Sequence, residues 1–343
     1  MKFDRMAPGG GVNVTCRLEN ARAYLEWNFY VTEKDSRQEM GYVPPASPQV
    51  TVRVCLKDHR GEVVMEGMKP VGEEEPLEGI LLKPHLWNGT KDPYLYEVEA
   101  VLTEQRGRIL DRYSGKLPLR NLISRENCGE WEVLLNGETF RPQTVFYTLP
   151  NAGSEAGSQS MIMEDLQQLL RLGANLVCVS NEGTEGHLTH FARLCDRYGL
   201  LVCLRGQKGQ WAFVGERMVK ICFQEEMPVY RGEEKGLFLP GNTWPSSLYY
   251  KYKARWGKEP FVYLAPDSVE KLKSGNYSVC CYSNCDRVAL YTDGALFEFQ
   301  RGQEEFVFRE IPAKSPCILL NAEGDGCVAS LSVHKISQSN FFH

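Results

Sequence analysis

Short runs in which apolar residues recur at every second position fill both ends of this chain, and they constrain its fold more than any other feature. In residues 94–102 this period of two is carried by Tyr94, Tyr96, Val98, Ala100 and Leu102. Similar runs predict strands at 13–18, 22–31, 49–56, 62–66 and 108–118. We therefore expect an antiparallel β-sandwich over residues 12–125, with the acidic, Pro- and Gly-rich stretch Gly67–Gly79 as an exposed loop.

The middle of the chain, residues 126–257, has a different texture. Glu130–Leu135 reads as a strand that ends in the turn pair Asn136–Gly137, and Phe140–Leu149 reads as another. A helix capped by Ser160, a buried strand at 176–180, a helix at 186–198 and a strand at 200–204 follow. This order is the opening of a parallel α/β structure. Helical spacing is also expected within Trp244–Trp256.

Alternating strands return over residues 258–337, which predicts a second, smaller β-sandwich. The runs that carry this prediction are 261–264, 277–282, 287–292, 305–309, 317–322 and 326–333.

Length, charge and cysteine spacing limit the function classes. The 343 residues predict two or three domains, and the net charge of −5 argues against nucleic acid or an anionic membrane as a partner. Residues 1–14 lack the apolar core of a secretory signal, and no run of 18 apolar residues predicts a transmembrane helix. We expect a cytoplasmic protein. None of the twelve cysteines has zinc-ligand spacing, so we expect buried free thiols, no metal and no cofactor.

Several motifs stand in the order found in one enzyme family. They resemble segments of the family 2 glycoside hydrolases, the β-galactosidase and β-glucuronidase family, at Pro84–Trp87, Asp92–Tyr96 and the Leu134–Glu138 hairpin. The most specific match is Gly173–Asn175 with Leu194–Leu200. Pro118–Arg120 is similar to the family's Gly-aromatic-Arg segment, with Pro118–Leu119 in place of the first two residues. Further along, the chain resembles the stretch that follows the catalytic barrel in this family, at residues 235–237, 249–256, 259–264 and 282–294.

The resemblance implies an immunoglobulin-like β-sandwich, a truncated (β/α)-barrel remnant and a second, C-terminal immunoglobulin-like β-sandwich. It also implies that the family's catalytic machinery is missing. Retaining glycosidases need two carboxylates about 5–5.5 Å apart, and a full barrel takes about 250 residues, rarely fewer than about 200. Fewer than a hundred residues separate Gly137 from Lys235. The family's Arg-His-Glu segment is replaced by Phe146–Asn151, and the arginine of its second-strand segment is Cys178.

Few residues remain as site candidates. Glu182, in an Asn-Glu pair after the predicted second strand, is a candidate acid or base, although the family's Asn-Glu pair follows strand four. Trp211 and Trp244 are candidates for stacking on a sugar ring. His187 and His190 could share a helix face, but no third metal ligand accompanies them. Core packing, helix capping or solvent exposure are the competing interpretations for all of these residues.

We therefore predict a glycoside hydrolase-like protein without activity, which recognises carbohydrate or serves as a partner subunit. The alternative is a β-galactosidase-like enzyme with a site rebuilt from Glu182 and a carboxylate between Glu216 and Glu234; a third hypothesis is a decayed gene fragment. A three-strand remnant would leave apolar surface uncovered, so we expect self-association, a partner protein, or covering by Gln207–Gly257.

Overall fold

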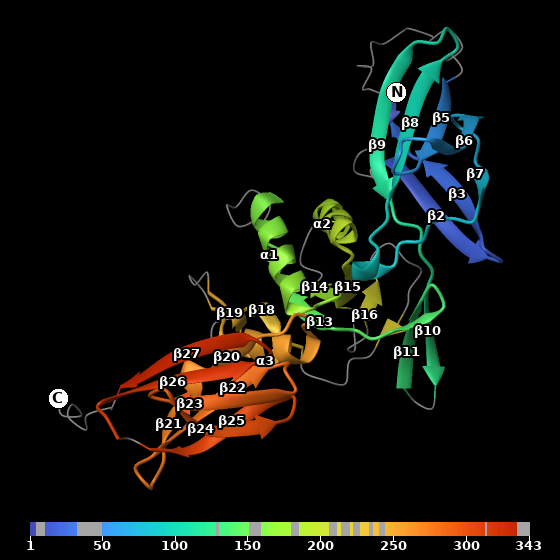
Figure 1. The fold of residues 1–343 in the computed structure, drawn as a ribbon. Coiled ribbons are helices and arrows are strands. Elements are labelled where there is room, and N and C mark those ends of the chain that lie inside the picture. The colour runs from blue at the N-terminus through green and yellow to red at the C-terminus, as the bar shows by residue number, and fades with distance from the viewer. Residues whose placement is uncertain are drawn as a thin grey trace, which may run out of the picture. The chain divides into compact units, whose positions relative to one another are not determined.

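The computed structural model describes residues 1–4, 11–32, 50–127, 130–150, 159–179, 185–205, 211–213, 220–221, 227–232, 236–239, 244–312 and 314–334. These residues form mainly β-strands, with three α-helices (Figure 1). The chain divides into two compact units. The first comprises residues 1–142, 149–163 and 175–224, and the second comprises residues 143–148, 164–174 and 225–343.

The first unit begins with a β-sandwich. One sheet has the strand order β2 (Val12–Glu19), β3 (Arg22–Phe29), β7 (Leu77–Leu82). The other has the order β6 (Val63–Pro70), β5 (Val50–Lys57), β8 (Tyr96–Glu104), β9 (Ile109–Leu117). Short strands β1 (Lys2–Phe3) and β4 (Val31–Thr32) pair beside them. All neighbours in these sheets are antiparallel, as the alternating sequence predicts.

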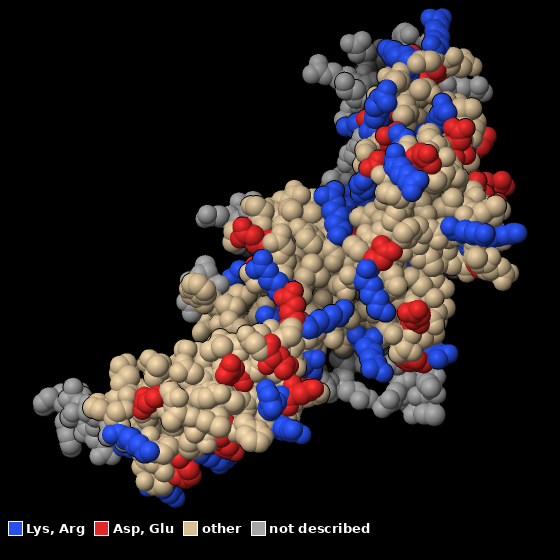
Figure 2. All heavy atoms as spheres, viewed as in Figure 1, with Lys and Arg blue, Asp and Glu red and all other residues tan. Residues whose placement is uncertain are grey.

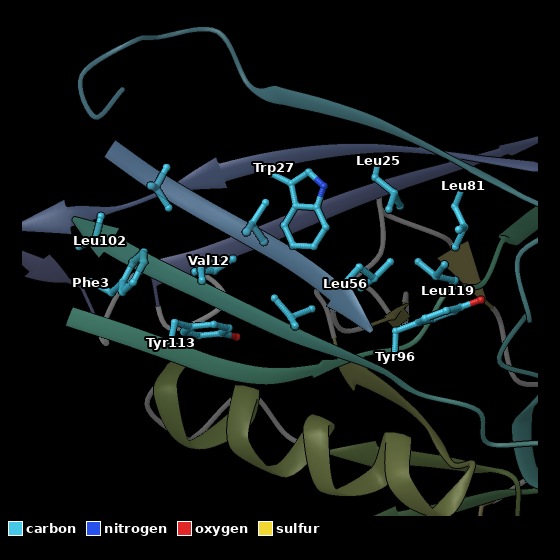
Figure 3. Close-up of a cluster of buried hydrophobic side chains, with 14 of the residues drawn as sticks. Phe3, Val12, Leu25, Trp27, Leu56, Leu81, Tyr96, Leu102, Tyr113 and Leu119 are labelled. Atoms are coloured by element: carbon cyan, nitrogen blue, oxygen red, sulfur yellow. The ribbon is translucent and has the colours of Figure 1, made fainter. Parts of the chain in front are cut away.

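A single hydrophobic core joins the two sheets of this sandwich (Figure 3). Leu25 and Trp27 of β3 enter it from one sheet, and Leu56 of β5 enters it from the other, all at most 1% exposed. The predicted apolar face of β8 is buried at Tyr96, Val98, Ala100 and Leu102. The period of two in the sequence therefore reflects one face on the core and one face in solvent.

The prediction of an exposed loop over Gly67–Gly79 is wrong. Strand β6 runs to Pro70, and the missed strand β7 starts at Leu77, so only the residues between them form a turn. Close packing explains why two glycines occur in this stretch. A Cβ on Gly67 would lie 2.8 Å from the Leu77 side chain, and one on Gly79 would lie 2.3 Å from Met65 Sδ. Glycine here allows close approach of two strands and does not mark a loop.

The rest of the first unit holds two further groups of strands. A small antiparallel sheet has the order β10 (Leu122–Asn127), β11 (Glu130–Leu135), β12 (Glu138–Phe140). The α/β part has the order β17 (Lys220–Ile221), β16 (Trp211–Phe213), β15 (Leu201–Arg205), β14 (Leu176–Val179), and includes helix α2 (Glu185–Tyr198). Strands β14 and β15 are parallel, whereas β16 and β17 are antiparallel. All four residues of β14 are fully buried, as its uninterrupted apolar sequence predicts.

The second unit also contains α/β elements. Strand β13 (Thr144–Tyr147) pairs in parallel with β18 (Val229–Arg231), and β18 pairs in parallel with β19 (Gly236–Phe238). Helix α1 (Gln159–Leu172) contributes its second and third turns to this unit, and helix α3 (Ser247–Trp256) confirms the helical spacing in the aromatic segment. Ser160 lies in the first turn of α1 and not before it, because the helix begins one residue earlier than expected.

A second β-sandwich completes this unit. In one sheet β22 (Tyr277–Ser283) pairs with β20 (Val262–Leu264), β21 (Glu270–Lys271) and β25 (Glu304–Ile311). The other sheet has the order β24 (Ala295–Arg301), β23 (Arg287–Thr292), β26 (Cys317–Gly324), β27 (Cys327–His334). Both sheets contribute to one core, which includes Val279, Phe306, Leu290 and Leu320. Strand β24 was missed because most of its residues are exposed on both faces.

Truncation of Leu25 tests the core of the first sandwich. The variant Leu25→Ala should lower the free energy of unfolding by about 2–5 kcal/mol, because it removes buried methyl groups and leaves a cavity. The matched variant Met68→Ala, at a side chain that is 65% exposed in the same sandwich, should change it by less than about 0.5 kcal/mol. Urea denaturation measures both, and equal losses would contradict the assigned core.

Candidate functional site

The carboxyl ends of the parallel strands are the first place to look for a site, since α/β folds bind ligands there. Glu182 follows the carboxyl end of β14 but lies outside the described residues, as does the stretch from Glu216 to Val219. Trp211 is the first residue of β16, and its side chain is likewise not described. On α2, His190 is exposed, and the side chain of His187 is not described. Of the predicted site residues, the structure therefore describes the side chains of His190 and Trp244, and Trp244 is the more informative.

Trp244 is 80% exposed, the highest exposed fraction among the large hydrophobic residues described. Its position follows from the backbone: Pro245 forms a bridge with Phe238, the last residue of β19, and the Ser246 amide donates to the Leu237 carbonyl at 2.9 Å. The chain thus runs back antiparallel to β19. Trp244 therefore lies beside the carboxyl end of β19, with its ring in solvent.

Arg231 of the same unit lies across β19 from this position. It ends β18 directly opposite Phe238 of β19, and its guanidinium lies 5.9 Å from the centre of the Phe238 ring. The Arg231 Nη2 donates to Asp165 Oδ1 at 2.8 Å, and the side chain keeps 44% of its surface exposed. An exposed indole and a half-exposed guanidinium therefore both lie near the carboxyl ends of β18 and β19, on opposite sides of Phe238.

Asp165 is a buried carboxylate of this unit, and both of its oxygens accept hydrogen bonds. It lies on α1 and is 6% exposed. Tyr147 Oη donates to its Oδ2 at 2.9 Å, while Tyr230 Oη donates to its Oδ1 at 2.7 Å alongside Arg231. These donors join α1 to β13 and β18, so Asp165 ties the helix to the strands. Its partners are two tyrosines and an arginine, where a glycosidase would need a second carboxyl group.

The electrostatics of this cluster favour a structural role. Burial, followed by the hydrogen bond to Asp165, raises the pKa of Tyr230 far above its usual range, so this phenol stays protonated. Burial acts against the charge on Arg231, but the nearby Asp165 carboxylate outweighs it and raises the arginine pKa. The cluster therefore keeps its hydrogen bonds through the physiological pH range.

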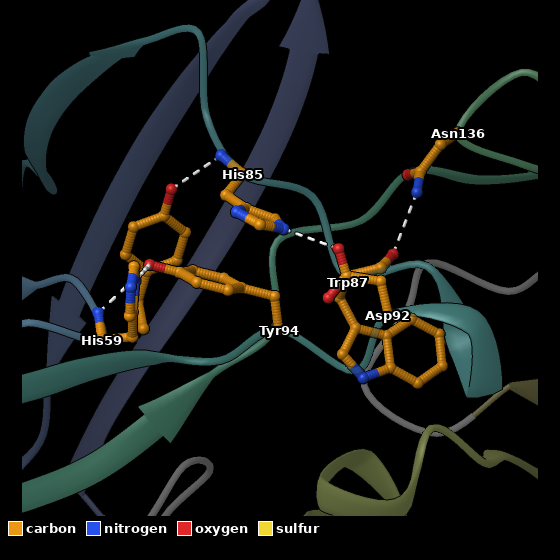
Figure 4. Close-up of polar contacts among 7 residues, drawn as sticks. His59, His85, Trp87, Asp92, Tyr94 and Asn136 are labelled. Atoms are coloured by element: carbon orange, nitrogen blue, oxygen red, sulfur yellow. Dashed lines mark hydrogen bonds and ion pairs between the residues drawn. The ribbon is translucent and has the colours of Figure 1, made fainter.

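A second buried network, in the first unit, is formed by the residues of the family-like motifs. Trp87 Nε1 donates to the Asp196 carbonyl at 2.8 Å, and Arg120 Nη1 donates to the Asp196 carboxylate at 2.6 Å. The Arg120 guanidinium lies 4.5 Å from the centre of the Trp87 ring. The Asn136 side-chain amide donates to the Trp87 carbonyl at 2.9 Å and so adds the β11–β12 turn (Figure 4). Together these contacts fasten the first sandwich to the end of α2.

Two glycines show how closely the chain packs at the family-like motifs. Gly199 follows α2 with φ of 75°, and a Cβ there would lie 2.5 Å from the Gly89 carbonyl oxygen. Gly173 follows α1 with φ of 97°, and a Cβ there would lie 2.4 Å from the Trp256 carbonyl oxygen. Both positions combine a left-handed backbone with a close approach, which only glycine permits.

Sequence reasoning missed an exposed cluster of histidines and tyrosines around Tyr94 (Figure 4). The His85 ring stacks on Tyr94 with 3.9 Å between ring centres, and its Nε2 lies 2.6 Å from Asp92 Oδ2. The His59 amide donates to Tyr94 Oη at 3.2 Å. The spacing of His85, Asp92 and Tyr94 within one motif was the available signal. These contacts brace the β5–β6 turn and the segment after β7, and both ionic partners are about half exposed.

The cysteines are only partly as expected. Cys178 and Cys203 form a disulfide, because they occupy partner positions on the parallel strands β14 and β15 with Cα atoms 4.8 Å apart. The expectation of free thiols is therefore wrong for this pair. Cys195, Cys280, Cys281 and Cys285 are buried free thiols. Burial raises the pKa of Cys280 to about 11 and that of Cys281 to about 12, so both are unreactive thiols near neutral pH.

Other kinds of site find little support in the described part of the chain. No group of three or more His, Cys, Asp or Glu side chains there could hold a metal ion. No described helix is both long and apolar enough to cross a membrane. Acidic and basic side chains are interspersed over the face shown in Figure 2.

One segment of the chain matches a known protein family. Residues 40–120, which cover most of the first sandwich, match the model of the glycosyl hydrolases family 2. No curated protein matches the sequence. The resemblance predicted from the motifs is confirmed: residues 40–120 are similar to the glycosyl hydrolases family 2.

Solved structures of such enzymes share the fold at low sequence identity. The FMN-binding β-glucuronidase from Facaelibacterium prausnitzii L2-6 is 15% identical with a TM-score of 0.67, over 98% of this chain and 75% of that one. A putative β-galactosidase from Bacteroides fragilis is 14% identical with a TM-score of 0.67, over 97% and 74%. Bacteroides uniformis β-glucuronidase 2, covalently bound to cyclophellitol-6-carboxylate aziridine, is 13% identical with a TM-score of 0.64, over 97% and 62%. At these identities the likeness establishes the fold alone.

The buried Arg120–Asp196 pair should be essential for stability. Arg120→Ala should lower the free energy of unfolding by about 3–5 kcal/mol, because it leaves the Asp196 carboxylate, 15% exposed, without its ionic partner. Arg125→Ala is the matched control: its pair with Glu132 is on the surface and should contribute about 0–1 kcal/mol. Thermal and urea unfolding of the two variants compare them, and similar losses would refute this assignment.

Proposed function

We propose that this chain is a family 2-like protein without glycosidase activity, and that it recognises carbohydrate. The observation that carries the proposal is the set of carboxylates in residues 143–239. In this segment only Glu164, Asp165 and Asp196 have described carboxylate side chains. Asp165 and Asp196 are held by structural hydrogen bonds, and Glu164 is exposed on α1. These roles leave none of the three described carboxylates assigned to the acid or the nucleophile that glycoside hydrolysis requires.

We propose further that the α/β elements are the remnant of the family's barrel. The parallel pairs β13–β18 and β14–β15, with α1 and α2, support this interpretation. The proposed domains are an immunoglobulin-like sandwich at 12–125, a truncated barrel with its following linker at 126–257, and a second sandwich at 258–337. Too few residues lie between β13 and β19 for eight strand–helix repeats, because a barrel takes at least about 200 residues.

The exposed end of β18 and β19 supports carbohydrate recognition. Sugar rings stack their C–H faces on aromatic rings, and their hydroxyl groups accept hydrogen bonds from guanidinium N–H groups. Trp244 offers such a platform at 80% exposure, with Arg231 at the same strand ends. Trp211 is a second proposed platform. A partner subunit or a second copy of the chain remains the other proposed kind of ligand.

The alternative function is a glycosidase with a rebuilt site around Glu182 and a carboxylate from Glu216–Glu234. This segment includes several acidic residues that lie outside the described part of the chain. Measured activity distinguishes it from the proposal.

The purified chain should not hydrolyse chromogenic β-galactosides, β-glucuronides or β-mannosides above the rate in buffer. The reason is that, of the described carboxylates in residues 143–239, Asp165 and Asp196 are held by structural hydrogen bonds and Glu164 is exposed on α1. The Glu182→Gln variant, measured beside it, should behave identically. Turnover that disappears in this variant would establish the rebuilt site and overturn the proposal.

Trp244→Ala should weaken binding of any oligosaccharide that the chain retains on a glycan panel. We expect a loss of about tenfold or more in affinity, which corresponds to one lost stacking contact. Phe299→Ala is the matched control, because Phe299 is a 56% exposed aromatic residue on the second sandwich. Equal binding by both variants, or no binding by the unaltered chain, would contradict carbohydrate recognition at this position.

A further inference from the structure

Strand β7 is an outer strand of the first sandwich with an unusual side-chain pattern. It pairs with β3 on one side, and no described strand pairs with its other side (Figure 1). Its outward-facing residues include Ile80, 55% exposed, and Leu82, 66% exposed. Two large aliphatic side chains are therefore exposed on a strand that has no described strand on its outer side.

Soluble proteins usually protect such edges with lysine, proline or a bulge. The neighbouring outer strand β6 has this protection in Lys69 and Pro70. Strand β7 has neither residue in its sequence LEGILL, and its register with β3 is continuous from Leu77 to Leu82. The difference between the two outer strands marks β7 as a pairing surface.

We propose that two copies of this chain associate by antiparallel pairing of their β7 strands about a two-fold axis at Ile80. The three-stranded sheets β2-β3-β7 of the two copies then form one continuous six-stranded sheet. A two-fold axis makes the surface self-complementary, as in most homodimers.

The alternation of side chains fixes the register. Outward residues must lie opposite outward residues, so the pairs across the axis have to join Glu78, Ile80 and Leu82 among themselves. Centring the axis on Ile80 uses all three positions. Ile80 then lies opposite the partner's Ile80, and Leu82 lies opposite the partner's Glu78. The pairing brings the exposed Ile80 side chains of both copies into lateral contact and keeps the two Glu78 carboxylates apart.

Charge complementarity supports this register. On β3, Tyr24 lies beside Ile80 and the exposed Arg22 lies beside Leu82. The partner's Glu78 would lie two strand spacings from Arg22, about 10 Å between Cα atoms. The long side chains of an arginine and a glutamate together span this distance above Leu82. In the single chain, no ion pair joins Arg22 or Glu78 to another residue that the structure describes. Dimerisation would therefore create two symmetric ion pairs.

Sedimentation velocity of the full chain over a range of concentrations tests the proposal. The unaltered chain should show a monomer–dimer equilibrium, and Ile80→Lys should sediment as a monomer, because two lysines would face each other across the axis. Val328→Lys is the matched control: Val328 is 64% exposed on an outer strand of the second sandwich, and this variant should dimerise normally. Circular dichroism should show that both variants are folded.

A charge exchange tests the register. Glu78→Arg should weaken the dimer by about tenfold, as two ion pairs become repulsive. Adding Arg22→Glu to this variant should restore the affinity. A monomeric unaltered chain would overturn the proposal, and so would dimerisation of Ile80→Lys. Failure of the double variant to recover would overturn the register. None of these outcomes depends on carbohydrate binding or hydrolysis.

Discussion

The contact between Trp87, Arg120 and Asp196 determines how the first unit is assembled. A buried arginine pairs with a carboxylate, stacks on an indole, and shares Asp196 with the indole N–H. The Asp196 carboxylate balances the buried charge of Arg120, and the Asp196 carbonyl accepts the hydrogen bond of the Trp87 indole. An unpaired charge there would be strongly destabilising. Asn136 and Gly199 depend on this arrangement, since one binds the Trp87 backbone and the other packs on Gly89. The family-like motifs are thus the residues that fasten a β-sandwich to an α/β layer.

This explains why the sequence indicated the family more clearly than the function. The motifs around Trp87, Gly173 and Gly199 are under geometric constraint, because they combine buried polar contacts with backbone conformations open only to glycine. The carboxyl ends of β14 and β15, in contrast, lead into residues outside the described part of the chain. A fold can therefore be recognised from its packing residues even where the residues of its reaction are absent or altered.

Most strands and all three described helices could be predicted, since each buries one periodic face. The failures have physical causes. Strand β7 was hidden because Gly67 of β6 and Gly79 of β7 looked like loop residues, while they allow close packing against Leu77 and Met65. Strand β24 was missed because both of its faces are largely exposed. The Cys178–Cys203 disulfide depends on strand register, which spacing in the sequence does not reveal. Of the site residues, Trp244 could be proposed, but its exposure could not be foreseen.

The proposal that most needs a test is that no carboxylate of this chain acts as a glycosidase nucleophile. Cyclophellitol aziridines of glucuronate, galactose and mannose configuration test it directly, because they esterify such a nucleophile without requiring turnover. Intact-mass spectrometry of the chain after incubation should show only the unmodified mass, while an active family 2 enzyme treated in parallel should gain one adduct. A single stoichiometric adduct that maps to one glutamate of this chain would contradict the account.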